Sequence, residues 1–280
     1  MKLDLRVFTG ETMDTERFQK NIEQADSNSL RIGAANRVLQ LLQKLRYSNN
    51  ENSAKRWVWE LCQNAKDICN NTGKVKIAIA FDEGNKKVVF KHNGKAFSIT
   101  NVMSLINQSS SKDRNDGVQR TSGKFGTGFL TTHLLSEIVD LSGILETEAG
   151  SFSNFHFTLD RTGHEQKEIV RAMEKAVQQL MECTPLRDVP DWEAYNTIFE
   201  YALDEDGIEV AKQGIENLRV TAPFVLSMIE DIEEIFLEST GEVFRYNQSH
   251  TSQEENALVH EILYESKITK KNIYILNLTE

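Results

Sequence analysis

The segment around which the chain is organised reads Glu60-Leu61-Cys62-Gln63-Asn64-Ala65-Lys66-Asp67. It places a carboxylate, a carboxamide and a second carboxylate at positions i, i+4 and i+7, which form one stripe along a helix. The neighbouring stripe of Leu61, Ala65 and Ile68 is apolar, and this pattern predicts an amphipathic helix. A plain surface helix carries its charges on the outside, whereas these polar groups lie at the edge of the buried face.

Two glycine-bearing loops follow this helix, namely His92-Asn93-Gly94 and Gly123-Lys124-Phe125-Gly126-Thr127-Gly128. Glycines let backbone amides approach phosphate oxygens, and a helix predicted to begin after Gly128 offers its positive end to them. Residues 108–122, between the loops, are almost entirely polar. Such a long polar segment inside a compact domain is more typical of a functional lid than of packing. Together these features indicate a nucleotide site.

The composition narrows the class of protein. A chain of 280 residues makes one large domain or two. Its net charge of −10 argues against a protein that mainly coats duplex nucleic acid, so a nucleic-acid partner is not indicated. No apolar run approaches the ~20 residues of a membrane span, and the first residues lack the apolar core of a signal peptide.

The spacing of the cysteines bears on whether the protein belongs to a reducing or an oxidising compartment. Cys62 and Cys69 lie about 10 Å apart on one predicted helix, too far for a disulfide, and Cys183 is the only other cysteine. We therefore predict reduced thiols and a cytoplasmic protein without a membrane partner.

Hydrophobic periodicity predicts an α+β chain. Within residues 1–46, helices are predicted to begin near 14 and near 29. Further helices are predicted after 53 up to about 69 and over 101–107 (capped by Thr100), 129–136, 164–182, 207–218 and 223–230. Strands are predicted over 74–81, 87–91, 138–145, 152–159, 197–203, 234–237, 243–246, 259–265 and 273–278.

The predicted organisation has three parts. Residues 1–46 form a helical N-terminal arm, and residues 47–205 form the nucleotide-binding domain. Residues 206–280 extend the same unit or begin a following domain. The last residues come directly after an apolar strand, without a terminal cap, and further C-terminal domains are therefore expected.

The helix and the two glycine loops resemble the three ordered boxes of the GHKL ATPase superfamily, which includes the ninety-kilodalton heat-shock chaperone, gyrase B, MutL and the histidine kinases. The resemblance covers roughly residues 45–205 and is closest to the chaperone branch and its sacsin-like relatives. It implies the Bergerat α/β sandwich, a mostly antiparallel mixed sheet with helices packed on one face and an ATP lid. It also implies ATP (or ADP) and Mg²⁺ as ligands.

The resemblance and the residue chemistry imply distinct roles along the helix. Glu60 is the candidate catalytic residue, which orients or deprotonates the attacking water as general base. Asn64, one turn further on, offers an amide oxygen to Mg²⁺ and is the candidate metal ligand. Asp67 supports the nucleotide pocket, with a purely structural backbone contact as an equal alternative.

The remaining candidates surround the phosphates and the base. Lys112 and Lys124 add positive charge to the phosphates or are ordinary lid charges. His133, between leucines of the helix after the loop, is interpreted as a packed residue. The candidate nucleotide-binding residues are Asn64, Asp67, His92, Asn93, Gly94, Lys112, Gly123, Lys124, Phe125, Gly126, Thr127, Gly128 and Thr197.

The chain departs from the family pattern at two positions. Most relatives carry an aspartate that accepts the adenine amino proton where this chain has His92. A neutral imidazole nitrogen can also accept a hydrogen bond, so adenine recognition is compatible with histidine, as it is with a backbone carbonyl or water. The segment Asn196-Thr197 resembles the late Gly-Thr strand of the family, with asparagine in place of glycine; Thr197 then contacts the region of Asp67 or adenine.

The leading functional hypothesis is a Mg²⁺-dependent ATPase with slow turnover. Its lid closes over the γ-phosphate and signals the nucleotide state to further domains or to a dimer partner, with residues 1–46 as the arm that contacts the partner or the lid. A histidine kinase is disfavoured because no histidine precedes His92. A nonhydrolytic nucleotide-sensing module, or the ATPase part of a larger DNA-directed or defence-type machine, remain as alternatives.

Overall fold

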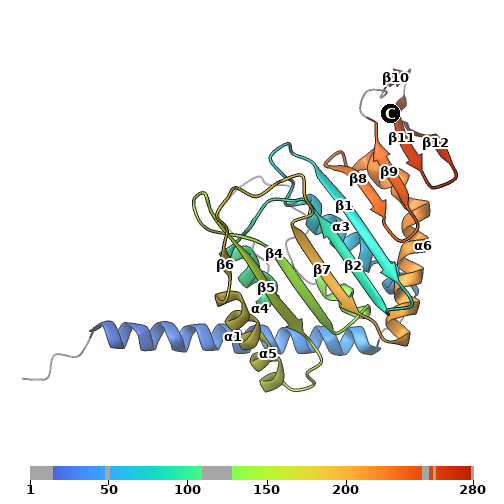
Figure 1. Cartoon of the computed structure of the whole chain (residues 1–280). Coiled ribbons are helices and arrows are strands. Elements are labelled where there is room, and N and C mark those ends of the chain that lie inside the picture. Colours follow the sequence, from blue (N-terminus) through green and yellow to red (C-terminus); the bar gives the residue numbers. More distant parts are fainter. Residues whose placement is uncertain (1–14, 48–50, 109–127, 248–251, 255–256, 279–280) are drawn as a thin grey trace, which may run out of the picture.

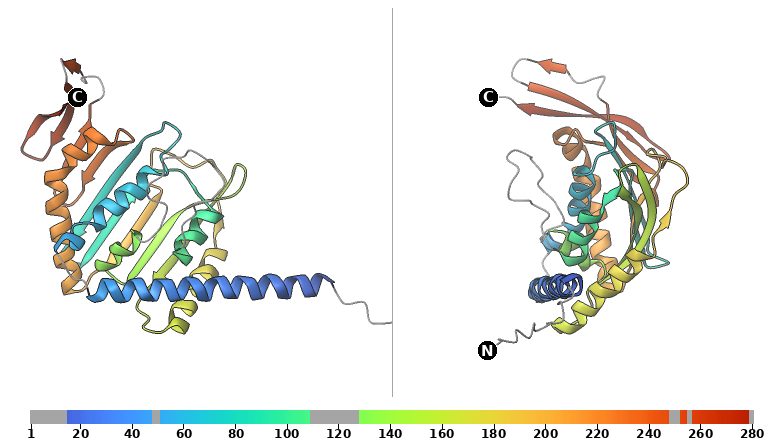
Figure 2. Two further views of the ribbon diagram at one scale, coloured as in Figure 1. Left: turned by 180° about the vertical axis from the view of Figure 1, so that it is seen from behind. Right: turned by 90° about the vertical axis from the view of Figure 1, so that its left-hand side faces the viewer.

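The computed structural model describes residues 15–47, 51–108, 128–247, 252–254 and 257–278. In these ranges the strands form one large mixed sheet, and the helices lie mainly on one of its faces (Figure 1 and Figure 2). The predicted α+β class with a large mixed sheet is therefore confirmed. None of the described helices is both long and apolar enough to cross a membrane.

The described strands belong to a single sheet of 12 strands in the order β10-β11-β9-β8-β1-β2-β7-β4-β5-β6, with β12 beside β11 and β3 beside β4. Most neighbouring strands are antiparallel, and the β1–β8 and β3–β4 pairs are parallel. The strands are β1 (Val75–Asp82), β2 (Lys87–His92), β3 (Phe97–Ser98), β4 (Ile138–Glu148), β5 (Ser151–Asp160), β6 (Thr184–Pro185), β7 (Thr197–Ala202), β8 (Ile232–Leu237), β9 (Glu242–Tyr246), β10 (Ser252–Glu254), β11 (Ala257–Glu265) and β12 (Lys270–Leu278).

Helices cover the inner face of the sheet, and α1 crosses one end of it (Figure 2). The helices are α1 (Thr15–Tyr47), α2 (Glu51–Ala54), α3 (Trp57–Lys66), α4 (Ile99–Asn107), the 3₁₀ helix η1 (Phe129–Leu134), α5 (Gln166–Met181) and α6 (Glu205–Met228). The N-terminal part of α1 extends past the edge of the sheet (Figure 1).

Alternation of side chains along the central strands decides what faces the helices. In β2 the buried side chains are Val88, Phe90 and His92, and the residues between them lie on the more exposed face. In β7 the buried set begins with Thr197 and continues with Phe199. Because successive side chains of a strand point to opposite faces, both His92 and Thr197 face the helical layer.

Helix α3 is held in the middle of this layer by Trp57, which is fully buried. Its indole Nε1 donates a hydrogen bond to the carbonyl oxygen of Val210 on α6, at 3.1 Å. One turn along α6, the ring lies against Gly214, where an added Cβ would come within 2.1 Å of Nε1. Glycine at this position lets the two helices pack closely.

Arg46 fixes the C-terminal end of α1 to the open end of the β4–β5 hairpin, where β4 begins and β5 ends. Its Nε donates to the Glu137 carboxylate at 2.6 Å, and its Nη2 donates to the carbonyl oxygen of Arg161 at 2.9 Å. Earlier in α1, Arg31 pairs with Glu174 of α5 at 3.5 Å. These polar contacts orient α1 across the domain.

Several helix boundaries differ from the sequence prediction. The two helices expected in residues 1–46 form the single helix α1, and the two expected at 207–218 and 223–230 form the single helix α6. Pro223 lies inside α6. A proline removes one backbone donor from the helix, and here the packed helix continues in spite of that loss. Tertiary packing outweighs the local breaker signals in these helices.

The ends of the helices near the site also differ. The cap of α4 is Ser98, whose Oγ accepts the backbone N–H of Asn101, whereas Thr100 was expected. The helix predicted after residue 53 up to about 69 is the shorter helix α3, with Asp67 as its C-terminal cap residue, and the separate helix α2 lies mostly before the predicted start. The segment after Gly128 forms the 3₁₀ helix η1 in place of the expected α-helix.

One glycine substitution, Gly214→Ala, tests the packing of α3 on α6, and a second, Gly33→Ala in α1, is its control. Gly214→Ala is expected to lower the free energy of unfolding by about 1–3 kcal/mol, because the new methyl group overlaps the Trp57 ring. At Gly33 in α1 the Cβ position is open space. Gly33→Ala is therefore expected to raise the free energy of unfolding by up to about 1 kcal/mol, because alanine has the higher helix propensity. Urea denaturation followed by circular dichroism measures both. A stabilising Gly214→Ala would contradict the close packing.

Candidate functional site

The side chains of the polar stripe, which the sequence predicted to lie at the edge of the buried face of the helix, are largely buried. The Glu60 side chain is 15% exposed and the Asp67 side chain 6%. Between them, Asn64 is 6% exposed. Three polar groups of one stripe are thus largely removed from water, and each needs a partner to offset the cost of burial.

The N-terminal end of the stripe contacts the end of the second glycine loop. Glu60 Oε1 accepts a hydrogen bond from Arg56 Nη2 at 3.0 Å. Its other oxygen, Oε2, lies so close to Gly128 that an added Cβ there would be 2.1 Å away. Gly128 therefore allows the backbone that precedes η1 to lie directly against a carboxylate oxygen, which any larger residue would displace.

Asn64 contributes a polar group without a partner. Its Nδ2 is buried and has no hydrogen-bond partner in the part of the chain that the structure describes. A buried amide without a partner costs on the order of 1–3 kcal/mol. Because the amide oxygen and nitrogen can exchange places by a half-turn of the group, Asn64 can present either atom to a ligand.

The C-terminal end of the stripe contacts the first glycine loop. The Ile68 carbonyl oxygen, just after α3, accepts the backbone N–H of Lys95 at 2.9 Å. A Cβ added to Gly94 would lie 2.5 Å from that carbonyl oxygen, so glycine is required for this approach. Asp67 forms an ion pair with Lys66 at 3.4 Å. The two glycine loops therefore meet the two ends of one helical stripe.

His92 lies at the end of β2 beneath this contact. It is 1% exposed, and Nδ1 accepts the backbone N–H of Gly94 at 3.1 Å. Burial lowers the pKa of His92 to about 3, so its imidazole is neutral at pH 7. Its register partner on β7 is Thr197, which is equally buried. The sheet thus brings together two predicted base-reading residues that are more than a hundred positions apart.

Asn93 has a structural role in the same loop. It is fully buried, and its Oδ1 accepts the backbone N–H of Lys76 on β1 at 2.7 Å. This bond ties the loop to the neighbouring strand and positions Gly94 below α3. The Nδ2 of Asn93 is buried and has no partner among the described residues.

Several predicted site residues lie outside the described residues. They are Lys112, Gly123, Lys124, Phe125, Gly126 and Thr127. The predicted lid also lies outside, apart from Gln108, the left-handed C-terminal cap residue of α4. Of the second glycine loop, the structure describes Gly128 alone.

A buried cluster that the sequence prediction did not include lies at the C-terminal end of α4. Arg161, which is 1% exposed, donates from Nη2 to the carbonyl oxygen of Ile106 at 2.7 Å, as a cation suits a helix C-terminus. Burial lowers its pKa to about 10. His133 is buried nearby, and burial, followed by the charge of Arg161, lowers the pKa of its imidazole to about 3. His133 is thus a packed residue, as predicted.

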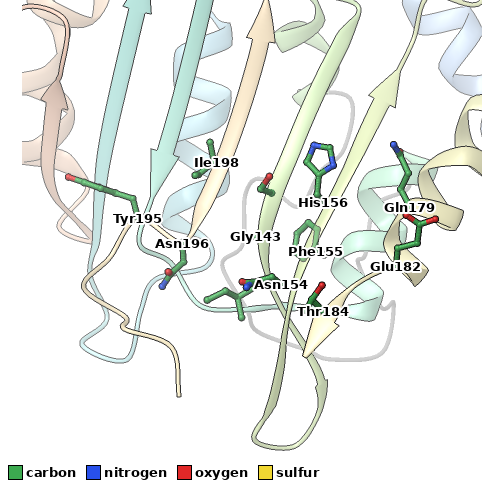
Figure 3. A pocket seen from close by; sticks show the side chains of 12 residues that line it. Gly143, Asn154, Phe155, His156, Gln179, Glu182, Thr184, Tyr195, Asn196 and Ile198 are labelled. Carbon is green, nitrogen blue, oxygen red and sulfur yellow. The ribbon is translucent and has the colours of Figure 1, made fainter. Parts of the chain in front are cut away.

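A hollow of about 530 Å³ lies on the face of the sheet away from α3 (Figure 3). Outward-facing side chains of β4, β5 and β7 line it, together with the end of α5 and the segment before β7. His156 lies here and approaches Asp140 at 3.8 Å. The lining also includes Asn154, Gln179, Glu182, Thr184, Tyr195 and Asn196.

Comparison of the sequence with models of known protein families and with curated proteins finds no match. Within the described ranges, no group of three or more histidine, cysteine, aspartate or glutamate residues is placed to hold a metal ion.

The buried histidines predict a pH dependence of stability. The pKa values of His92 and His133 are lowered to about 3, so between roughly pH 3 and 6.5 the unfolded chain binds more protons than the folded one. Each histidine therefore removes about 1.4 kcal/mol from the free energy of unfolding between pH 7.5 and 5.5. Urea denaturation at both pH values should show that His92→Asn loses less stability on acidification than the unchanged chain. An equal loss would contradict the neutral buried state of His92.

Proposed function

We propose that this chain contains a GHKL-type nucleotide-binding domain that binds ATP with Mg²⁺ and hydrolyses it slowly. The observation that carries the proposal is the placement of one glycine loop at each end of the polar stripe of α3. Gly128 contacts Glu60, and Gly94 contacts the carbonyl oxygen of Ile68 just beyond Asp67. A nucleotide bound beneath α3 would have its phosphates at the Gly128 end and its base at the His92 end.

The residues present suit such a ligand in three respects. Gly128 leaves the Glu60 carboxylate in direct contact with the backbone before η1, where close approach to phosphates is needed. Asn64 holds a buried amide group without a partner, which a ligand would satisfy. His92 and Thr197 form a buried polar pair on adjacent strands, next to the apolar side chains of Phe90 and Phe199.

Glu60 is the candidate for the general base. Arg56 holds Oε1 at 3.0 Å, and Oε2 is directed at the Gly128 backbone. A carboxylate held in this way can orient a water molecule and accept its proton as the water attacks the γ-phosphate. Its position on the packed helix α3 fixes the backbone from which the carboxylate extends.

Asn64 is the candidate ligand of Mg²⁺, through its amide oxygen, one helical turn from Glu60. Bound Mg²⁺ neutralises negative charge on the phosphates. The order of Glu60, Asn64 and Asp67 along α3 then separates the hydrolytic end of the site from the base end. Asp67 supports the base end, and its ion pair with Lys66 keeps the side chain at the end of the helix.

The wider cycle follows from the same proposal. The segment 108–122 would act as the lid over the γ-phosphate, with Lys112 and the Gly123–Gly128 loop contacting the phosphates. The projecting N-terminal part of α1 would contact a partner chain or the lid (Figure 1). Lid closure would then signal the nucleotide state to a dimer partner or to further domains, in a cytoplasmic protein.

A nonhydrolytic nucleotide sensor is the second candidate function, and one contact favours it. The ion pair between Arg56 and Glu60 occupies one carboxylate oxygen, and the other oxygen lies against Gly128, which leaves little of the carboxylate to contact a water molecule. Nucleotide binding without phosphate release at long times would support the sensor.

Substitution of Glu60 tests the hydrolytic role. Glu60→Gln keeps the shape of the side chain but removes the base, and is expected to lower the rate of phosphate release by about 10²–10⁴-fold while sparing ATP binding. Gln63→Ala, at an exposed position of the same helix, is the matched control and should keep full activity. Unchanged turnover of purified Glu60→Gln protein would contradict the assignment.

Substitution of Asn64 tests the metal role separately. Asn64→Ala is expected to weaken ATP binding in the presence of Mg²⁺ by at least roughly tenfold, because the metal loses a protein ligand. Binding of ATP in the presence of EDTA should change much less. Titration calorimetry with and without Mg²⁺ measures both, and an equal effect in the two conditions would remove Asn64 from the metal site.

A further inference from the structure

The hydrogen bond between His92 and Gly94 determines which ring nitrogen carries the proton. The donor is a backbone N–H, so Nδ1 must be the acceptor and must be unprotonated. A neutral imidazole carries one proton, and here it therefore lies on Nε2. The tautomer follows from an unambiguous donor and does not depend on an assumed hydrogen position.

The ring is also held in one orientation. Its Nδ1–Cε1 edge packs against Gly94, whose added Cβ would lie 2.9 Å from Nδ1 and 3.2 Å from Cε1. Phe90 and Phe199 flank the ring, each with its ring centroid 6.3 Å away. A half-turn of the imidazole would replace the acceptor Nδ1 with a C–H group and leave the buried Gly94 N–H unsatisfied, which is costly.

Among the described residues, Nε2–H makes no hydrogen bond. The interactions of His92 comprise the bond from Gly94 and the two contacts with phenylalanine rings. Beside it, the hydroxyl of Thr197 can either donate or accept. The pair therefore combines one fixed donor and one adaptable group on the helical face of the sheet.

We propose that His92 reads the nucleotide base as a hydrogen-bond donor, so that its Nε2–H pairs with an acceptor atom of the base and makes no contact with an exocyclic amino group. The inference rests on the proposed nucleotide site and defines its base selectivity. It reverses the polarity expected from the sequence, where the imidazole was to accept the amino proton of adenine. The acceptor on the base is a ring nitrogen or a 6-oxo group.

The test has one arm that needs no nucleotide. Nitrogen-15 NMR of the histidine rings in the full chain reports the tautomer, with the His92 signals assigned by their loss in His92→Asn. The inference requires a proton on Nε2. A proton on Nδ1 would overturn it, whatever the protein binds.

The second arm measures affinity for ATP, for inosine triphosphate and for purine riboside triphosphate, which lacks the 6-amino group. Purine riboside triphosphate should bind within about twofold of ATP, since the amino group makes no contact with His92. Tighter binding of inosine triphosphate identifies the 6-oxo group as the acceptor. Weaker binding identifies N1, which carries a proton in inosine, and unchanged binding identifies N3 or N7, which accept in both bases. A loss of tenfold or more on removing the amino group overturns the inference.

A matched pair of variants changes only whether the group at position 92 donates a hydrogen bond or accepts one. In both His92→Asn and His92→Asp an oxygen can accept the Gly94 N–H, but the second terminal atom is a donor in asparagine and an acceptor in aspartate. The asparagine variant should keep the ratio of affinities near one, whereas the aspartate variant should favour ATP over purine riboside triphosphate by roughly tenfold. Equal ratios in two folded variants overturn the inference.

Failure of the proposed function gives a different result. If none of the three triphosphates binds, the nucleotide site itself is wrong and the inference falls with it. If they bind but the amino group controls affinity, only the donor role of His92 is wrong. If the aspartate variant does not fold, the tautomer and the affinities of the unchanged chain still decide.

Discussion

The contact between Gly128 and the Glu60 carboxylate is the constraint on which the site depends. A side chain at position 128 would occupy the space of the carboxylate, so the backbone after the glycine loop can reach α3 only because glycine lacks a Cβ. The same reason applies to Gly94 and the carbonyl oxygen of Ile68 at the other end of the helix. Two close approaches thus define the ends of one buried polar stripe.

Side chains alternate between the two faces of the sheet, and this alternation decides which residues face the helices. Residues that face the helices are mostly apolar along β2 and β7, and two polar exceptions lie where β2 ends and β7 begins. There His92 and Thr197 are register partners, and both are buried. On the other face, ion pairs such as Lys91 with Glu238 and Lys87 with Glu200 cross between neighbouring segments. The two faces therefore differ in chemistry, and the proposed site belongs to the helical face.

Much of the fold was predictable because its signals are local. The alternating strands, the β1–β2 hairpin and the amphipathic helix at Gln166–Met181 follow from short-range periodicity. The predictions that were wrong concern helix ends. Pro223 reads as a break in the sequence, and yet α6 continues through it, because burial against the sheet outweighs one lost hydrogen bond.

The sequence by itself determined the spacing of Glu60, Asn64 and Asp67 on one helical stripe, the glycines that permit close approach, and the strand alternation. Only the tertiary structure decided that Thr197 lies opposite His92, that Arg161 closes the end of α4, and that the free nitrogen of His92 is a donor. Spacing along a helix or strand depends on backbone geometry, which any sequence shares. Register, burial and the direction of a hydrogen bond depend on contacts between distant segments, and those exist only once the chain has folded.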